Sequence, residues 1–347
     1  MELNINQLAN KLLGILNPRQ RDILEKRFGL KDSKVMTLDA LGKIYGVTRE
    51  RVRQIEAGAI KELSFLIKEG VLSHFLNKVS EHLKNLGGIR RETLLLADLQ
   101  MLLGESSSIT FDNKVKFLLS LSGAVKYFTE DKEFYSYWYL ENQDKKKAVD
   151  FIKKLIKFLE NKKSTVVSQN NIDQVFTEAI KPSNFKDLVA LNYLSISKKF
   201  HINQYGDFGL SHWPEINPKT VRDWAHLVIK KQNKPIHFME IAKLINGVRG
   251  GAKIANPQTV HNELIKDSRF VLVGRGIYGL KDFGLIAGTT KEVMKRLLKE
   301  HGPMTPKELL GLVLKERVLK KNTIFVNLQN RKHFKRLDNG CYTINIA

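Results

Sequence analysis

The chain has 347 residues, 42% of them hydrophobic, and a formal net charge of +22 at pH 7. This length and apolar content exclude a wholly disordered chain and predict about two to four small packed domains. No apolar run reaches the roughly 20 residues of a membrane span, and Met1–Asn4 lacks the basic start of a signal peptide, so we expect a soluble, intracellular protein.

The positive charge is concentrated toward the C-terminus. Residues 1–70 carry 13 basic and 9 acidic side chains, residues 71–216 carry 20 and 17, and residues 217–347 carry 25 and 10. The last third therefore has most of the electrostatic attraction for a polyanion such as nucleic acid. A solvated basic surface without a ligand is the alternative interpretation.

The first strong helix prediction begins at Pro18 and runs to about residue 29. Asn17 supplies its N-cap, proline suits the first helical position, and Gln20 completes a capping box. Thr37 caps a second helix, and Gly46 can take the left-handed conformation of a tight interhelical turn. This spacing predicts a helix-turn-helix.

The run from Thr48 to Ala59 predicts the third helix, with Val52, Ile55 and Ala59 on one face. The opposite face carries side chains suited to reading base edges in a major groove, namely Arg49, Glu50, Arg53 and Gln54. Arginine bonds the acceptor edge of guanine, glutamine bonds adenine, and a carboxylate accepts from the cytosine amino group. An acidic residue among arginines argues against a purely phosphate-binding surface, and an ordinary solvated helix face is the alternative.

These residues resemble region 4 of the bacterial sigma-70 family, the domain that reads the promoter −35 element. The matching stretches are Leu16–Arg21, Arg27–Leu30, Thr37–Gly42 and Thr48–Glu56, and the resemblance covers about residues 16–66. It implies base contacts from Arg49, Glu50, Arg53 and Gln54. It also implies DNA-backbone contacts from Thr48 and Arg51, with a protein partner as the alternative for Arg51.

A complete sigma factor carries earlier domains that hold the polymerase and melt the −10 region. Only about 16 residues precede the resemblance in this chain, and they predict a short amphipathic stretch. We therefore expect no autonomous promoter opening.

A pattern of helices followed by an aromatic hairpin recurs about every 65 to 70 residues. The four candidate hairpins pair residues 125–128 with 134–140, 200–202 with 208–210, 269–273 with 277–280, and 334–337 with 341–344. Gly274-Arg275-Gly276 and Asp338-Asn339-Gly340 have suitable turn chemistry. Helices followed by a two-stranded wing predict winged-helix domains.

The first two repeats are the less basic ones. The tip of the first hairpin, Thr129–Glu133, is acidic and would be repelled by phosphate, so we expect these repeats to act as spacers or to bind protein. Aromatic residues on their short strands predict core positions, with a stacking platform for single strands as the alternative. The residues concerned are Trp138, Tyr139, Phe208 and Trp213.

The third repeat has the clearest pattern. Residues 221–229 and 238–245 predict its first two helices, and Asn256-Pro257 opens the third. Together with Thr259–Asp267 and the wing Arg269–Leu280, these residues resemble the HARE-HTH family of winged helices over about residues 217–285. Members of that family serve both nucleic-acid binding and protein binding, so the resemblance implies a fold more firmly than a function.

The fourth repeat begins near Thr290, and Thr305–Glu308 is a capping box that opens its second helix. Basic residues in its third helix and wing predict contacts with DNA phosphates, with solvated surface as the alternative. These residues are Lys320, Lys321, Arg331, Lys332, Lys335 and Arg336. Arg275, at the preceding wing tip, suits a narrow minor groove. The single cysteine, Cys341, excludes an internal disulfide, and we expect it to be unreactive in a buried strand position.

The predicted fold class is mainly α with small β-hairpin wings. An N-terminal helix-turn-helix (residues 1–70) precedes a tandem array of four winged-helix domains, at residues 71–142, 143–216, 217–285 and 286–347.

We expect no enzymatic activity, catalytic residue, cofactor, metal site or small-molecule substrate. The nine histidines lack metal-ligand spacing, and no nucleophile and base fall in a recognisable arrangement. Gly247–Lys253 is glycine-rich and basic, yet it lacks the spacing of a phosphate-binding loop and predicts an ordinary flexible loop.

The leading hypothesis is a sequence-specific transcription regulator that binds double-stranded DNA, is located in the cytoplasm with the nucleoid, and has no membrane partner. The alternative is an accessory protein that binds the RNA polymerase core through helix one, with the winged helices as protein-interaction modules. A third hypothesis, the specificity component of a defence nuclease, rests only on the HARE-HTH resemblance. No nuclease motif supports it.

Overall fold

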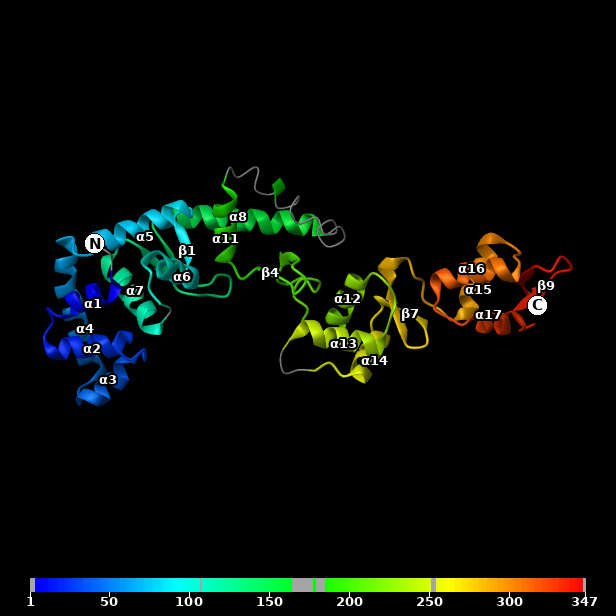
Figure 1. Cartoon of the computed structure of the whole chain (residues 1–347), viewed down its shortest axis with the longest axis horizontal. Coiled ribbons are helices and arrows are strands. Elements are labelled where there is room, and N and C mark those ends of the chain that lie inside the picture. Colours follow the sequence, from blue (N-terminus) through cyan, green and yellow to red (C-terminus); the bar gives the residue numbers. More distant parts are fainter. Residues whose placement is uncertain (1–3, 107, 164–176, 179–184, 251–253, 346–347) are drawn as a thin grey trace. The chain divides into compact units, whose positions relative to one another are not determined.

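The computed structural model describes residues 4–106, 108–163, 177–178, 185–250 and 254–345 (Figure 1). The chain divides into two compact units, Met1–Phe200 and His201–Ala347. Among the described residues, no helix combines the length and the apolar character that a membrane crossing requires.

The first unit opens with α1 (Ile5–Leu13), α2 (Pro18–Phe28), α3 (Leu38–Tyr45) and α4 (Arg49–Lys68). The predicted caps of the helix-turn-helix are confirmed: Asn17 and Gln20 form a capping box, and Thr37 caps α3. Gly46 ends α3 in the left-handed conformation, at φ +64°.

Two hydrophobic cores meet along α4. A small core holds Ile23 of α2, Leu41 of α3 and Val52 of α4, all fully buried. A larger core receives Ala59 and Leu63 from the C-terminal half of α4, together with side chains of α1 and of three later helices. The same helix therefore joins the helix-turn-helix to the rest of the unit.

The later helices belong to a segment with a three-stranded sheet. Its elements are α5 (Ser73–Asn85), β1 (Ile89–Arg91), α6 (Glu92–Leu103), α7 (Ile109–Ser122), β2 (Lys126–Phe128) and β3 (Tyr137–Tyr139). The sheet is antiparallel with β3 in the middle, in the order β1-β3-β2. Trp138 and Tyr139 of β3 are buried, which confirms the prediction that they are core residues.

The third helix of this segment, α7, packs on the helix-turn-helix. Asn113 of α7 donates a hydrogen bond to the Gly29 carbonyl at 3.1 Å, and the rings of Phe28 and Phe117 lie 5.0 Å apart. Lys114 bonds Asn6, which immediately follows the first residue of α1, at 2.6 Å. This face of α7 is therefore covered within the first unit.

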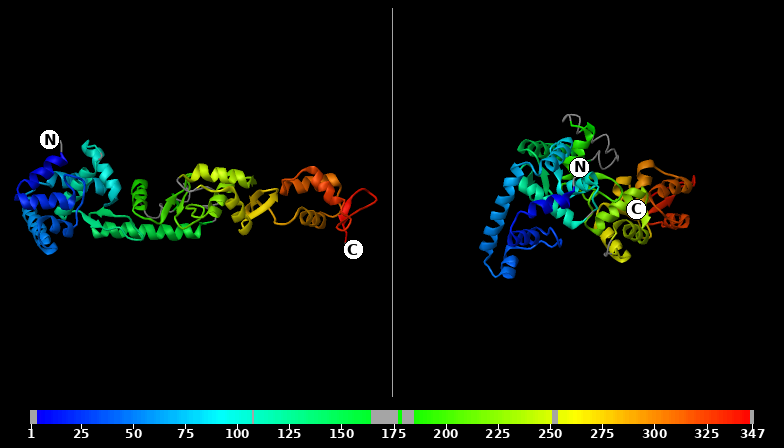
Figure 2. Two further views of the ribbon diagram at one scale, coloured as in Figure 1. Left: turned by 90° about the horizontal axis from the view of Figure 1, so that it is seen from below. Right: turned by 60° about the vertical axis from the view of Figure 1, so that its left-hand side comes forward.

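The first unit ends with α8 (Asn142–Asn161), the long green helix of Figures 1 and 2, and α11 (Asp187–Ser195). Asn192 of α11 is buried and donates to the carbonyls of Leu86 and Ile89 at 2.7 and 2.6 Å. It also accepts from Arg90, which holds Asp98 at 2.8 and 3.0 Å. These bonds join α11 to the segment that precedes α8.

The division between the units falls after the first residue of β4 (Phe200–Ile202), which forms a hairpin with β5 (Phe208–Leu210). Trp213, which follows this hairpin, is buried. Residues 217–285 then form α12 (Val221–Gln232), β6 (Ile236–His237), α13 (Phe238–Arg249), α14 (Pro257–Lys266), β7 (Phe270–Gly274), β8 (Ile277–Leu280) and the 3-10 helix η2 (Lys281–Phe283). The sheet order is β6-β8-β7.

Residues 286–347, called here the C-terminal segment, contain α15 (Thr290–His301), α16 (Pro306–Glu316), α17 (Lys321–Leu328), β9 (Phe334–Arg336) and β10 (Tyr342–Ile344). A β-bridge between Met304 and Tyr342 occupies the same place in this element order as the β6–β8 pairing does in residues 217–285. Three segments of the chain thus share one element order, in which the first strand or bridge pairs with the last strand of a hairpin.

All four predicted hairpins are present, and two other predictions need correction. Cys341 is half-buried and precedes β10, because the turn continues to it through a bond from its N–H to Asn339. The predicted loop from Gly247 begins later than expected. Helix α13 continues to Arg249, since Leu244 and Val248 still pack against the core, and residues 251–253 lie outside the described residues.

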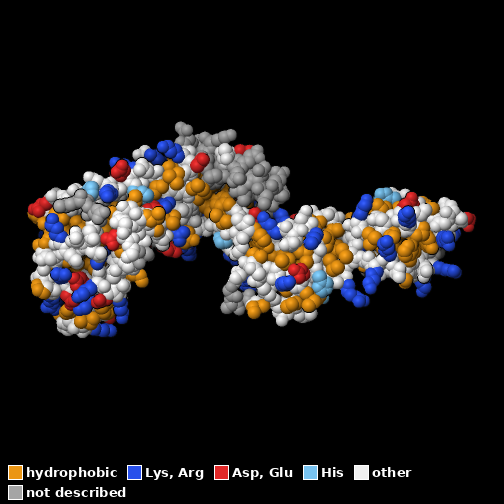
Figure 3. Space-filling model, viewed as in Figure 1, with side chains coloured by type: hydrophobic (Ala, Val, Ile, Leu, Met, Phe, Trp, Pro, Cys, Tyr) orange, Lys and Arg blue, Asp and Glu red, His pale blue; other side chains and the backbone are white. Residues whose placement is uncertain are grey.

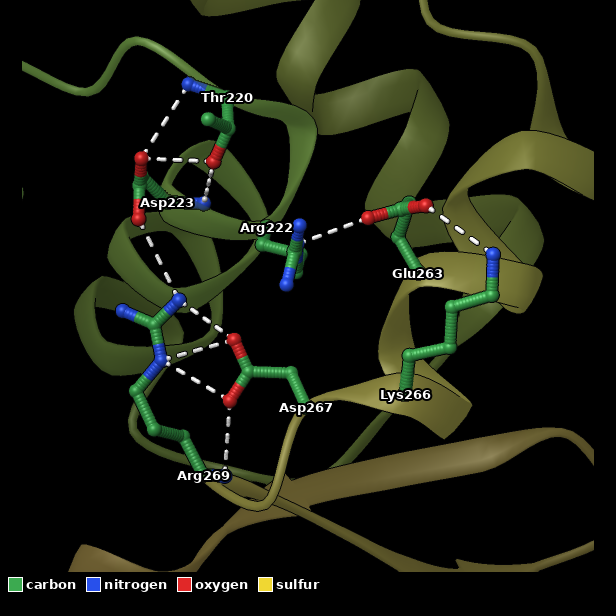
Figure 4. Close-up of polar contacts among 7 residues, drawn as sticks. All are labelled: Thr220, Arg222, Asp223, Glu263, Lys266, Asp267 and Arg269. Atoms are coloured by element: carbon green, nitrogen blue, oxygen red, sulfur yellow. Dashed lines mark hydrogen bonds and ion pairs between the residues drawn. The ribbon is translucent and has the colours of Figure 1, made fainter.

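A group of ion pairs connects α12 with α14 and with the residues between α14 and β7 (Figure 4). Arg269 lies between two carboxylates, with Nη2 at 2.7 Å from Asp267 and 3.3 Å from Asp223. Arg222 bonds Glu263 at 2.8 Å, and Lys266 lies 3.7 Å from the same side chain. The hydrogen bond from Arg269 is the main cause that lowers the pKa of Asp267.

Replacing Arg269 with alanine should lower the free energy of unfolding by about 1 to 2 kcal/mol, because two largely buried carboxylates lose their partner. Since both carboxyl pKa values are lowered in the folded state, this stabilisation is present above the unfolded pKa of about 4 and lost as the pH falls below it. Thermal melts of Arg269→Ala and wild type should therefore converge in acid. Lys266→Ala, which removes one exposed pair, should melt like wild type, and an equal loss in both variants would contradict the assignment.

Candidate nucleic-acid interface

The N-terminal end of α4 is positioned by a close turn after α3. Thr48 caps the helix by accepting a hydrogen bond from the backbone N–H of Arg51 at 3.2 Å. Gly42 lies directly beneath this turn, where an added Cβ would come within 2.7 Å of the Val47 carbonyl oxygen. A residue without a side chain is therefore required at position 42 for α3 and α4 to approach this closely.

The four predicted base-reading residues lie together on the exposed side of α4. Their side chains are all exposed, whereas Val52 and Ala59 on the opposite side are fully buried. Val52 and Ala59 confirm the predicted core-facing side, and Ile55, predicted on the same side, is half-buried. The four residues are Arg49, Glu50, Arg53 and Gln54.

Two pairs of side chains organise this face. Glu50 and Arg53 form a double contact, from Nε to Oε2 at 2.8 Å and from Nη2 to Oε1 at 2.6 Å. The hydrogen bond from Arg53 is also the main cause that lowers the pKa of Glu50. Arg51 donates to Gln54 at 3.2 Å. Because an exposed ion pair contributes little free energy, the Glu50–Arg53 pair holds the guanidinium in place yet can open toward a base.

An open groove lies between α3 and the start of α4. It is lined by Asp39, Gly42, Lys43, Gly46, Val47, Thr48, Arg49 and Arg51. The positive end of the α4 dipole and three basic side chains face the same region, and the single carboxylate, Asp39, is paired with Lys43 at 3.3 Å. The groove has the charge that a phosphate backbone beside the reading face would need.

Lys43 is the residue of this groove that sequence reasoning missed as a binding candidate. Its position one turn before the helix-ending Gly46 is the signal that was available. A lysine in the last turn of a helix is also expected simply to complement the helix dipole, so its place beside α4 needed the structure.

The other predicted DNA contacts lie in the second unit, and all are exposed. Arg275 lies in the turn between β7 and β8, and Lys320 and Lys321 lie at the start of α17. Four more residues lie on β9 or in the turn before it: Arg331, Lys332, Lys335 and Arg336. Figure 3 shows blue side chains projecting along the lower edge of this unit.

The acidic residues of the C-terminal segment serve its own fold. Glu292 and Glu308 complete the capping boxes of α15 and α16. Glu300 and Glu316 both bond Arg296. Asp338, in the final hairpin turn, is the fifth and last carboxylate among its 13 basic residues. Within the described part of this segment, no carboxylate forms an ion pair with the basic residues of α17 and β9.

Across residues 4–106, 108–163, 177–178, 185–250 and 254–345, no group of three or more His, Cys, Asp or Glu side chains is placed to hold an ion. The groups that gather at the α4 face are hydrogen-bond donors and acceptors, which suit recognition.

Residues 12–64 match the family described as sigma-70, region 4. A sigma-70 region 4 domain is therefore present at the N-terminal end, and its limits agree with α2, α3 and most of α4. The rest of the chain lies outside this match.

Similar curated proteins are RNA polymerase sigma factors. The chain is 46% identical to RNA polymerase sigma factor SigA of Nostoc sp. over 66 residues, which are 19% of this chain and 17% of that protein. It is 43% identical to SigA of Microcystis aeruginosa over 78 residues, 22% of this chain and 19% of that protein, and 45% identical to SigA of a Bacillus sp. over 75 residues, 22% and 20%. The chain thus spans a fifth or less of these relatives, and the similarity supports a DNA-binding role in transcription.

Gly42→Ala should destabilise the helix-turn-helix by about 1 to 3 kcal/mol, because its Cβ displaces the Val47 carbonyl. Gly58→Ala is the matched control: it lies inside α4 with no atom within 4 Å of an added Cβ, and should be neutral or stabilising by up to about 1 kcal/mol. Denaturant titrations of both variants test this. Equal midpoints would show that α3 and α4 are not held by this close approach.

Proposed function

We propose that this protein is a non-enzymatic, sequence-specific DNA-binding regulator of transcription, in which α4 reads a −35-type element. The observation that carries the proposal is the exposed face of α4, where Arg49, Glu50, Arg53 and Gln54 are presented by a helix that is rigidly buried on its other side. Their donors and acceptors match major-groove base edges. The protein would then work with the nucleoid DNA of the cytoplasm and needs no cofactor.

Winged-helix modules form the second part of the proposal. Residues 71–142, 217–285 and 286–347 share the order of three helices and a hairpin, with the first strand or bridge beside the last strand, and this supports a repeated winged-helix fold that is HARE-HTH-like in residues 217–285. In the last two, exposed Arg and Lys residues would contact phosphates and increase salt sensitivity. Linked modules that bind one duplex multiply their affinities.

Docking on RNA polymerase through α2 is the competing function. It requires an apolar and basic surface on that helix, but Ile23 and Leu24 are fully buried and Phe28 packs on Phe117. Arg19 and Arg21 remain the exposed basic residues of α2. The covered apolar face favours DNA reading by α4 as the main function, and polymerase binding becomes an outcome to be measured.

Single substitutions should separate base reading from backbone contact. Arg53→Ala or Gln54→Ala should cost about 1 to 3 kcal/mol on the specific site and relax preference at one base pair. Lys335→Ala should weaken specific and random duplexes alike, because a phosphate contact carries no sequence information. Binding titrations on both duplexes measure the difference, and equal losses on both for all three variants would exclude base reading by α4.

The deciding experiment is selection of bound sequences from a random duplex library by the full-length protein at near-physiological salt. Arg49→Ala/Gln54→Ala is selected in parallel, with Lys31→Ala/Lys34→Ala, two exposed residues outside α4, as a control that removes one more positive charge. A short motif that the first variant loses and the control keeps is the expected result. If the protein binds DNA but no motif is selected, the proposal is wrong. Binding of purified core RNA polymerase by the protein would then support the competing function.

A further inference from the structure

The wing of residues 217–285 is joined to the C-terminal segment by backbone contacts. The N–H of Val318 donates a hydrogen bond to the Val273 carbonyl of β7 at 2.8 Å. Gly274 packs so closely on the same residue that an added Cβ would come within 2.5 Å of the Val318 carbonyl oxygen. The wing edge and the extended stretch between α16 and α17 are therefore in direct contact.

Arg317 fixes the connecting chain on the other side of this contact. The residue is 3% exposed, and its guanidinium donates hydrogen bonds to the carbonyls of Ile286 at 2.7 Å and Gly288 at 3.1 Å. Both carbonyls belong to the stretch that leads into α15. Leaving this buried guanidinium without its acceptors would destabilise the fold, so the stretch before α15 and the extended stretch at Arg317 and Val318 are held together.

Three cations flank the contact. Arg275 follows Gly274 at the wing tip, and Lys320 and Lys321 follow Val318 by two and three residues. All three are exposed, and none forms an ion pair with a carboxylate in the described residues. The nearest acid in sequence, Glu316, bonds Arg296.

Other cations of the same unit are neutralised within the fold. Arg222, Lys266 and Arg269 all face carboxylates (Figure 4). The contrast is informative, because cations grouped without carboxylates repel one another and destabilise the folded state. A bound polyanion relieves that repulsion.

We propose that Arg275, Lys320 and Lys321 form one phosphate-binding surface across this junction, which holds the backbone of a single DNA duplex against both segments at once. The proposal rests on the proposed function and deepens it: the two segments bind as one preformed unit. Because the geometry exists before binding, no ordering of a flexible linker is needed when DNA is engaged.

The charge test uses the full-length protein and a labelled 40-base-pair duplex of random sequence, titrated at several salt concentrations. The junction variant is Arg275→Gln/Lys320→Gln/Lys321→Gln. The matched control removes three exposed lysines of the second unit that lie outside the residues of the junction, Lys219→Gln/Lys299→Gln/Lys307→Gln. The junction variant should lower the slope of log K against log salt by about 2 to 3, and the control by less than about 1, because each phosphate contact contributes about 0.9. Equal slopes for the two variants would overturn the proposal, leaving only a net-charge effect.

The geometry test changes no charge. Gly274→Ala should weaken binding of the random duplex several-fold by separating the wing from Val318, whereas Gly311→Ala, with open space around an added Cβ, should bind like wild type. When Gly274→Ala is already present, adding Arg275→Gln should weaken DNA binding less than the same substitution does in the wild-type protein. If Gly274→Ala binds the duplex as well as Gly311→Ala does, the three cations do not act as one surface and the proposal is wrong. Circular dichroism shows whether Gly274→Ala is still folded; if it is not, the salt slopes of the charge variants test the proposal.

Different results would contradict the proposed function of α4 and the proposed junction surface. If the junction variants match their controls while Arg49→Ala/Gln54→Ala loses the selected motif, α4 reads DNA and the junction surface does not exist. If the junction variant has the lower salt slope and no motif is ever selected, the second unit binds DNA backbone and the reading function of α4 is wrong.

Discussion

The structure depends on α4 being shared by two hydrophobic cores. Its first half contributes Val52 to the small helix-turn-helix core, and its second half contributes Ala59 and Leu63 to the core of the unit. Burial of these side chains fixes the rotation of the helix about its axis, since a turn of 100° would expose them. The reading face is therefore oriented by apolar contacts on the opposite side, and its polar residues can be chosen for DNA without a cost in stability.

Local sequence signals predicted the parts of the fold that depend on neighbouring residues. The capping box of Asn17 and Gln20, the cap at Thr37 and the hairpin turn before Gly340 are all local hydrogen-bonding patterns, and each was predicted correctly. Cys341 was placed wrongly for the same reason: the alternation of apolar residues around it indicates a strand, whereas the turn geometry that excludes it is decided by Asn339.

Packing contacts between residues far apart in the chain could not be predicted from the sequence. Nothing in the pattern of α7 indicates that Asn113 bonds the carbonyl of Gly29, 84 positions earlier, or that Gly274 contacts Val318. The basic residues were predicted from composition and place in a repeat, but their pairing was not. Nothing in the sequence distinguishes Arg222 and Arg269 from Arg275. In the structure, carboxylates pair with Arg222 and Arg269, whereas Arg275 forms no ion pair within the described residues.

The packing of α7 on α2 has a consequence for shortened forms of this chain. Leu63, Leu24 and Phe28 are covered by residues beyond position 70, so a region 4 sequence cut at that point would expose an apolar surface that its partners normally conceal. In this chain, the helix-turn-helix therefore depends on the helices that follow it to cover its apolar side. A fragment made to study the α4 face by itself should therefore extend at least to the end of α7 at Ser122.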